Sequence, residues 1–149
     1  MAKKQFIMRW SALNKQVRVE SIDHNQEIFD WFLTNLPTSC LQTVTVVAGK
    51  SLFMLNLPMS QECNWIQENC PLEDVVEMPE GRMTFFMTTG NVANLSCKFD
   101  QMTEPMSYVT WAEVVEEDKP ILREVGNRVW ENTMSDKMPI YVEFLGVEE

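Results

Sequence analysis

The residues with the clearest potential for chemistry lie in the stretch 81–108. Within it, Leu95, Cys97 and Phe99 occupy alternate positions, which is the period of a β-strand with one buried face. Lys98 then points to the opposite face, which we expect to be open. An ammonium group there is often merely solvated, but it is also the first indication of a site that could hold an anionic group.

The same stretch predicts the elements that would position Lys98. Residues 82–87 are bulky and favour a strand, and residues 88–91 supply turn chemistry because Gly90 and Asn91 accept positive φ angles at little cost. Residues 95–99 form the second strand of this hairpin. A short irregular segment leads to a third strand over residues 109–115.

Neither a metal nor a dinucleotide cofactor is expected. The four cysteines form no CxxC unit and His24 is the single histidine, so a structural zinc site is not predicted. The chain also lacks a GxGxxG fingerprint. His24 precedes a predicted helix start, where a role beside the helix cap or on the surface is the simpler interpretation.

Composition restricts the class of partner. The formal net charge of −10 argues against binding to nucleic acid, whose phosphates would be repelled. No apolar run is long enough to span a bilayer, so no membrane association is expected. The N-terminal residues lack an apolar signal region and are interpreted as a first strand. We therefore expect a cytoplasmic protein with reduced cysteines.

The remaining pattern predicts two more hairpins and two helices. Strands are expected over residues 5–10, 16–22, 41–48, 51–56 and 140–145. Asp23 or Asn25 is a predicted N-cap for a helix over residues 26–36, whose apolar residues form one stripe and which Pro37 ends. A second helix is expected from Pro120, because acidic residues precede a proline in its first turn.

Residues 57–79 are predicted to leave the regular structure. They contain three prolines, acidic residues and Trp65, and we expect at most short helical turns. A long insertion in a compact domain is often a lid or a binding loop, and a surface flap without chemistry is the equally weighted alternative.

The sum is a mainly β domain of about eight strands with two helices, which is typical of a closed barrel or a sandwich. At 149 residues a single domain over residues 1–149 is expected.

The order hairpin, helix, hairpin, excursion, hairpin, strand, helix, strand resembles the cyclophilin-like barrel. Residues 17–37 resemble that family's second strand and first helix, and residues 109–115 with the following helix resemble its seventh strand and second helix. True cyclophilins carry an arginine, a glutamine and aromatic residues on the outer face of the barrel. Here the strand 41–47 has no arginine, and Met-Leu-Asn-Leu replaces the Gln-Gly-Gly stretch, so prolyl isomerase activity is not expected.

The chain further resembles small bacterial cyclophilin-like proteins that include the cucumopine and mikimopine synthases. The matching segments are residues 78–81, 89–91, 102–105, 115–118 and 125–132. Lys98 and Asp100 depart from the pattern, because related chains carry an aromatic residue and a glycine there. The resemblance implies an opine synthase that joins L-histidine and 2-oxoglutarate by a Pictet–Spengler cyclisation without a redox cofactor.

Such a reaction needs cations for the carboxylates, an acid for the departing hydroxyl and a base for the ring proton. Candidate residues for these roles are Lys98, Lys50 and Arg82 as cations, Tyr108 as proton donor, Glu104 as base, and Phe53 and Trp65 as an aromatic wall. Each has a simpler alternative: Lys50 as an exposed turn residue, Arg82 as the partner of a glutamate such as Glu80, and Tyr108 as a capping aromatic residue.

Two functional classes therefore remain open. The first is the cofactor-free synthase, acting on small-molecule substrates and with a homodimer as an expected assembly. The second is a non-catalytic cyclophilin-like module that binds a small anion or a partner protein, which the net charge of −10 favours because a dianionic keto acid would be repelled. Convergence of Lys98, Lys50 and Arg82 beside Tyr108 on one surface would favour the synthase.

Overall fold

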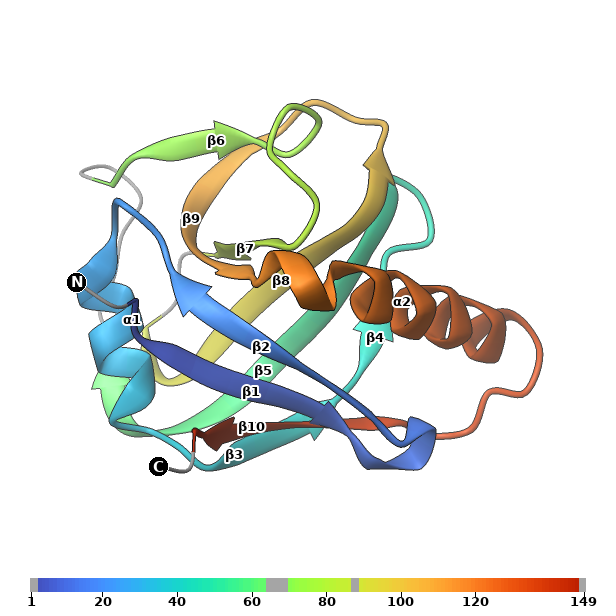
Figure 1. Ribbon diagram of the computed structural model, residues 1–149, viewed down its shortest axis with the longest axis horizontal. Coiled ribbons are helices and arrows are strands. Elements are labelled where there is room, and N and C mark those ends of the chain that lie inside the picture. Colours follow the sequence, from blue (N-terminus) through green and yellow to red (C-terminus); the bar gives the residue numbers. More distant parts are fainter. Residues whose placement is uncertain (1–2, 64–69, 87–88, 148–149) are drawn as a thin grey trace.

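The computed structural model describes residues 3–63, 70–86 and 89–147. Within them, one antiparallel sheet has the strand order β3-β10-β1-β2-β9-β7-β8-β5-β4, with β6 added on β9 (Figure 1). The strands are β1 (Gln5–Trp10), β2 (Lys15–Ser21), β3 (Thr38–Leu41), β4 (Thr43–Val44), β5 (Gly49–Cys63), β6 (Leu72–Asp74), β7 (Arg82–Phe85), β8 (Gly90–Met102), β9 (Ser107–Val114) and β10 (Tyr141–Gly146). The end strands β3 and β4 are separated in sequence only by Gln42, so the sheet nearly closes into a barrel. The mainly β barrel predicted from the sequence is confirmed.

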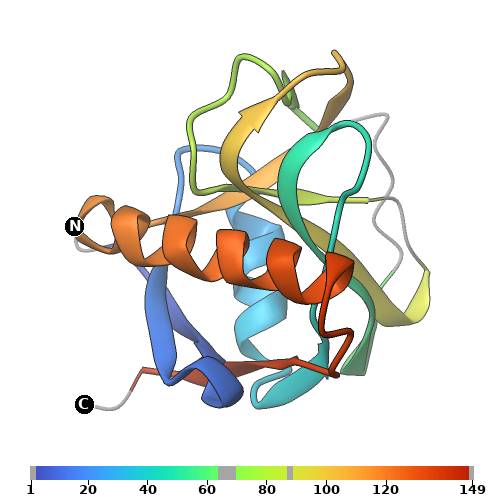
Figure 2. The same ribbon diagram turned by 90° about the vertical axis from the view of Figure 1, so that its right-hand side faces the viewer.

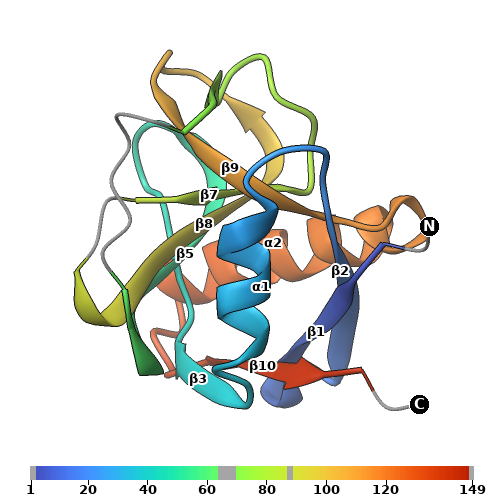
Figure 3. The same cartoon turned by 90° about the vertical axis from the view of Figure 1, so that its left-hand side faces the viewer.

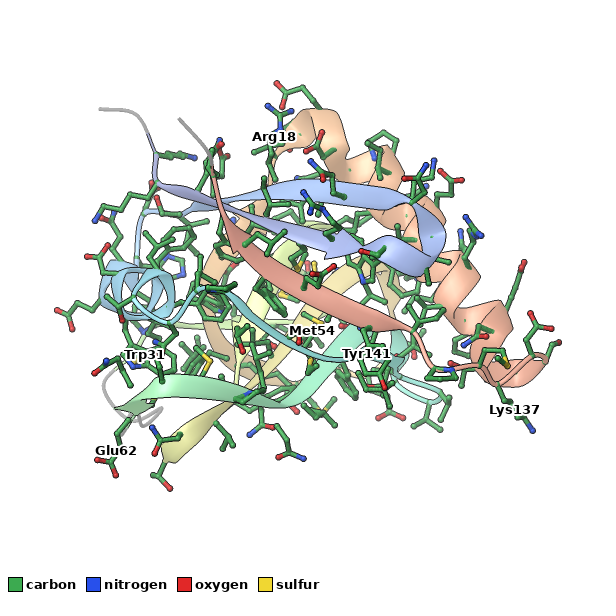
Figure 4. The ribbon with its side chains drawn as sticks, turned by 90° about the horizontal axis from the view of Figure 1, so that it is seen from below. Arg18, Trp31, Met54, Glu62, Lys137 and Tyr141 are labelled. Carbon is green, nitrogen blue, oxygen red and sulfur yellow. The ribbon has the colours of Figure 1, made fainter. Side chains whose placement is uncertain are left out.

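The inner face of the barrel is apolar because successive side chains of a strand are directed to opposite faces. In β1 every second residue is buried, and Phe6 and Met8 lie opposite Val19 and Val17 of β2. Figure 4 shows Met54 of β5 between the strands, whereas the labelled Glu62 and Lys137 lie at the periphery.

Helix α1 (Gln26–Leu33) lies across one end of the barrel (Figure 3). Its Phe32 ring lies 4.9 Å from the ring centroids of both Phe6 and Trp111, and 5.4 Å from that of Phe144. These four aromatic side chains are fully buried, so the helix completes the core that the strands begin.

Helix α2 (Lys119–Met134) covers the end of the barrel opposite α1 (Figure 2), and its buried Leu122, Val125 and Val129 join the core. It begins after a 3₁₀ turn (Glu116–Asp118) and has Pro120 in its first turn, as the sequence predicted. Gly126 allows the close approach, since a Cβ atom there would lie 2.3 Å from the ring of Phe99. Among the described residues, no helix is both long and apolar enough to cross a membrane.

The interpretation of residues 57–79 as an irregular excursion is wrong for its first part. Strand β5 continues to Cys63, and register shifts on both sides of Pro58 accommodate a residue that cannot donate a ladder hydrogen bond. The short strand β6 also lies in this range. Trp65 is outside the described residues.

The single strand expected over residues 41–48 is also wrong. The chain divides at Gln42, whose buried side-chain amide accepts a hydrogen bond from Nε1 of Trp10 at 2.8 Å and donates to the carbonyls of Thr43 and Phe53. This side chain replaces ladder hydrogen bonds, so β3 can pair with β10 while β4 pairs with β5.

Candidate functional site

The outer face of β9, β7, β8 and β5 carries a row of hydroxyl side chains. Thr110 lies opposite Thr84, Thr84 opposite Ser96, and Ser96 opposite Phe53. The hydroxyls of Thr84 and Ser96 are hydrogen-bonded to each other. Thr84 and Thr110 are fully buried and Ser96 is 4% exposed, so this row is an enclosed polar layer on the outside of the barrel.

A β-bulge in β9 places Thr110 on this face. Met83 lies opposite Ala112, but Thr84 lies opposite Thr110, so Trp111 is the extra residue of the bulge. Trp111 keeps its ring in the core, where it is fully buried, and Thr110 and Glu113 are both directed outward beside Arg82. A regular strand would have put Thr110 and Glu113 on opposite faces.

The carboxylate of Glu73 is the centre of a polar network at one end of this row. Glu73, on β6, accepts hydrogen bonds from Nη1 of Arg82 and from the hydroxyl of Thr110. Nε2 of His24 lies 2.8 Å from Oγ1 of Thr110 and 3.4 Å from Oε1 of Glu73. Because Thr110 donates its one proton to Glu73, it can only accept from His24, which assigns the ring proton of His24 to Nε2.

Arg82 joins Glu73 to a second carboxylate. Its Nε donates to Glu113 at 2.8 Å, and Nζ of Lys119 donates to the same carboxylate at 2.9 Å. Burial by itself raises the pKa of Glu113, but hydrogen bonds from Lys119 and Arg82 and the attraction of their charges outweigh burial and hold this pKa below its ordinary value. Arg82 does not pair with Glu80, whose partner is Arg123.

Asn25 fixes the loop that carries His24. It adopts a left-handed conformation with φ of 56° and makes no side-chain cap to α1, so the predicted N-cap hydrogen bond is wrong. Its side-chain amide instead donates to the carbonyls of Thr110 at 2.7 Å and Pro71 at 3.3 Å. The loop before α1 is thereby tied to β9 and to the segment that leads into β6.

An aromatic row continues the outer face beyond the hydroxyl row. The ring of Phe86 lies 5.9 Å from that of Phe53 and 5.0 Å from that of Tyr108, with both pairs edge to face. The hydroxyl of Tyr108 donates to Sδ of Met106. Tyr108 is the cross-strand neighbour of Glu73, so the aromatic row and the carboxylate meet at the β6–β9 ladder.

Three of the residues predicted from the sequence therefore belong to this group of outer-face side chains: Phe53, Arg82 and Tyr108. The predicted cations do not converge. Lys50 lies 3.9 Å from Asp100, beside a separate cavity bordered by Trp130. Glu104 is exposed in the turn between β8 and β9.

The expectation that Lys98 is open to solvent is wrong. It is directed to the outer face as the alternation predicted, but it is 5% exposed. Its Nζ donates to the carbonyls of Val75 at 2.8 Å, Val76 at 3.0 Å and Met78 at 2.8 Å. The segment between β6 and β7 covers it, which strand periodicity alone does not show.

A small cavity opens beside the network. Its volume is about 150 Å³, and its lining includes His24, Arg82 and Glu113 together with Glu20 and Asp23. The lining has three carboxylates and two cationic side chains, the paired guanidinium of Arg82 and the side chain of Lys3. The opening is therefore predominantly acidic. Such a lining favours a cationic group such as an ammonium over a dianion.

Sequence reasoning missed Glu73, His24 and Phe86. Glu73 lies on a three-residue strand inside the expected excursion, too short to show periodicity. Phe86 was assigned to a strand but not to a face, and His24 was interpreted as a residue beside a helix cap. The sequence carried one signal of the outer face itself: Thr84 and Ser96 lie on facing strands, which places two hydroxyls in register.

No protein-family model and no curated protein sequence matches the chain. A solved structure does: McbB in complex with tryptophan, with a TM-score of 0.82 and 24% sequence identity over 97% of this chain. The chain spans 45% of the length of the McbB chain. The likeness shows that the two share this barrel fold.

Proposed function

We propose that the outer-face site, formed by Glu73, Arg82 and Thr110 with the aromatic row of Phe53, Phe86 and Tyr108, is the active site of a condensing enzyme. The enzyme works without a redox cofactor and joins an aromatic amino acid to a keto acid. The observation that carries the proposal is the half-buried Glu73 carboxylate, held by Arg82 and Thr110 next to an aromatic row. A positioned carboxylate is a general base for a ring proton, and an aromatic row can stack against an imidazole or indole. That McbB, a barrel of the same fold, has been solved with tryptophan supports an aromatic amino acid as one substrate.

The proposed substrates are L-histidine and 2-oxoglutarate, as the resemblance to the opine synthases implies. The amine adds to the ketone to give a carbinolamine, which loses water to form an imine. A ring carbon of the imidazole then attacks the imine carbon, forming the new C–C bond, and loss of its proton restores aromaticity. The net change is the sum of both substrates minus one water.

The side chains of the outer-face site suit these steps. Tyr108 can protonate the departing hydroxyl, and Glu73 can take the ring proton. Arg82 uses Nε and Nη1 on its two glutamates, and its Nη2 makes no hydrogen bond within the described ranges, so it can bind a substrate carboxylate. Glu73 replaces Glu104 as the proposed base, since Glu104 lies on an exposed turn.

The test is mass spectrometry of purified protein incubated with L-histidine and 2-oxoglutarate, with no nicotinamide added. We expect a product at the summed mass minus one water that resists borohydride, because a cyclised adduct has no imine to reduce. L-Tryptophan in place of L-histidine tests which ring the site accepts. If neither amine gives product above the protein-free control, the synthase proposal is overturned and a binding module becomes the better account.

A further inference from the structure

The described part of the chain contains a buried charge outside the proposed site. The ammonium of Lys98 is surrounded by the backbone carbonyls of Val75, Val76 and Met78 at 2.8–3.0 Å. A carbonyl accepts but never donates, and an ammonium has three protons, so each proton has one partner. This arrangement matches the charged form of the amine.

Other charges near Lys98 support that form. Burial lowers the pKa of Lys98 below its ordinary value, while the negative charges of Glu80, Glu77 and Asp74 raise it. Glu77 and Glu80 lie on the segment that supplies the carbonyls, and Asp74 immediately precedes it. The segment therefore surrounds the cation with both dipoles and charge.

The three carbonyls around Lys98 begin at Val75, two residues after Glu73. Strand β6 has three residues and, within the described ranges, pairs with β9 alone, so the ladder by itself holds it weakly. After it, amides of Glu77 and Met78 bond back to the carbonyl of Asp74, which closes a tight turn. Lys98 attaches this turn to β8.

A second small apolar cluster lies beside the turn. Val75 and Met78 are buried against Ala48 and Met102, and Tyr108 packs on the same cluster. The turn is thus connected to two proposed functional residues. It continues the strand that carries Glu73, and its apolar side chains belong to the cluster on which Tyr108 packs.

We infer that Lys98 is a positioning residue: its ammonium, seated in the ring of three carbonyls, holds the turn against β8 and so keeps Glu73 on Arg82 and Thr110. The attachment stands independently of any activity. What Glu73 then does rests on the proposed function. Lys98 itself touches no substrate in this arrangement.

The test uses the full chain with Lys98→Met, which keeps the aliphatic stem and removes the charge, and Lys98→Ala, which leaves space for an added amine. Lys50→Ala is the matched control, because it removes another lysine charge outside this turn. Hydrogen exchange measured by mass spectrometry on peptides covering residues 72–78 reports the turn. In both Lys98 variants we expect exchange over residues 72–78 to be faster than in the wild type by about tenfold or more. In Lys50→Ala we expect the exchange rate to be unchanged.

The position of Glu73 has its own readout. His24 is the single histidine of the chain, so its ring nitrogens give one unambiguous set of ¹⁵N signals. In the wild type we expect the Nε2-protonated tautomer alone. If Glu73 leaves Thr110 in Lys98→Met, the hydroxyl can donate to His24 instead, and the signals should move toward a mixture of tautomers.

n-Propylammonium supplies the missing part of the side chain in Lys98→Ala. It should restore slow exchange and the single tautomer, whereas tetramethylammonium at equal ionic strength should not, because it has no N–H to donate. Where the condensation is measurable, kcat should fall about tenfold or more in Lys98→Met with a smaller change in KM, and n-propylammonium should raise kcat in Lys98→Ala.

Unchanged exchange over residues 72–78 in Lys98→Met would overturn the attachment. Faster exchange with an unchanged His24 spectrum would overturn the positioning of Glu73. If the wild type forms no condensation product, the proposed function fails alone, since the exchange and tautomer measurements still decide the role of Lys98.

Discussion

The two faces of the same three strands, β7, β8 and β9, are both buried but are built in different ways. Facing inward, Phe85, Leu95 and Cys97 pack in an apolar core in which each residue has many neighbours. Facing outward, Thr84, Ser96 and Thr110 are equally enclosed, yet each depends on one or two hydrogen-bond partners. Loss of an inner side chain creates a cavity, whereas loss of an outer partner leaves a polar atom unpaired.

The largest effect is expected on the inner face. Phe32→Ala should lower the free energy of unfolding by about 3–5 kcal/mol, because a fully buried ring with several aromatic contacts is replaced by a cavity. Urea denaturation measures this. The control is Tyr141→Ala, which removes a ring that is 60% exposed and should change stability by about 0.5 kcal/mol or less. Equal losses would show that α1 does not complete the core.

The second-largest loss of stability is expected for the charged network on the outer face. Arg82→Met should cost about 2–4 kcal/mol, because Glu73 loses its guanidinium partner and Glu113 keeps only Lys119. Arg123→Met removes an exposed arginine paired with Glu80 and should leave the unfolding midpoint nearly unchanged. A midpoint for Arg82→Met equal to that of Arg123→Met would contradict a stabilising role for the network of Arg82, Glu73 and Glu113.

A smaller effect is expected in the hydroxyl row. Thr84→Val should cost about 1–2 kcal/mol, since the shape is kept but Ser96 loses its buried partner. Adding Ser96→Ala should cost less than the sum of the single changes, because the second change removes the unpaired group. A double-mutant cycle measures this coupling, and strict additivity would mean that the two hydroxyls do not interact.

The smallest effect is a pH dependence on the acid side. The pKa of Glu113 is lower in the folded protein than in the unfolded chain, so its contribution is present above the unfolded value of 4.5 and is lost as pH falls through the folded value. The free energy of unfolding should therefore decline below about pH 4.5. Glu113→Gln should make the slope of that decline against pH shallower, by the amount that corresponds to at most one bound proton. An unchanged slope in Glu113→Gln would assign the decline to other carboxylates, such as Asp118 beside Arg18.

The inner face was far easier to predict from the sequence than the outer one. Alternation in residues 95–99 identified core positions, and the aromatic stripe of residues 26–36 identified α1, because burial imposes a period. The outer site depends on features without a period. The bulge at Trp111 places Thr110 outward, and the three-residue strand β6 brings Glu73 to it.

Lys98 shows the limit of periodicity most clearly. The alternation assigned it to the correct face, but whether a face is open depends on a segment distant in the sequence that covers it. Arg82, Phe53 and Tyr108 were found because their residue types suit the reaction, whereas Glu73 was not considered, because it lies on a three-residue strand inside the expected excursion.

The most direct test of the outer face as an active site compares Glu73→Gln with Glu104→Gln. Both changes remove one carboxylate with little change in volume, so the comparison isolates position. Initial rates of cyclised product from L-histidine and 2-oxoglutarate are measured by mass spectrometry. Loss of a general base predicts a rate about 10²–10⁴-fold lower in Glu73→Gln and a rate near that of the wild type in Glu104→Gln. Full activity in Glu73→Gln would contradict the assignment of this site.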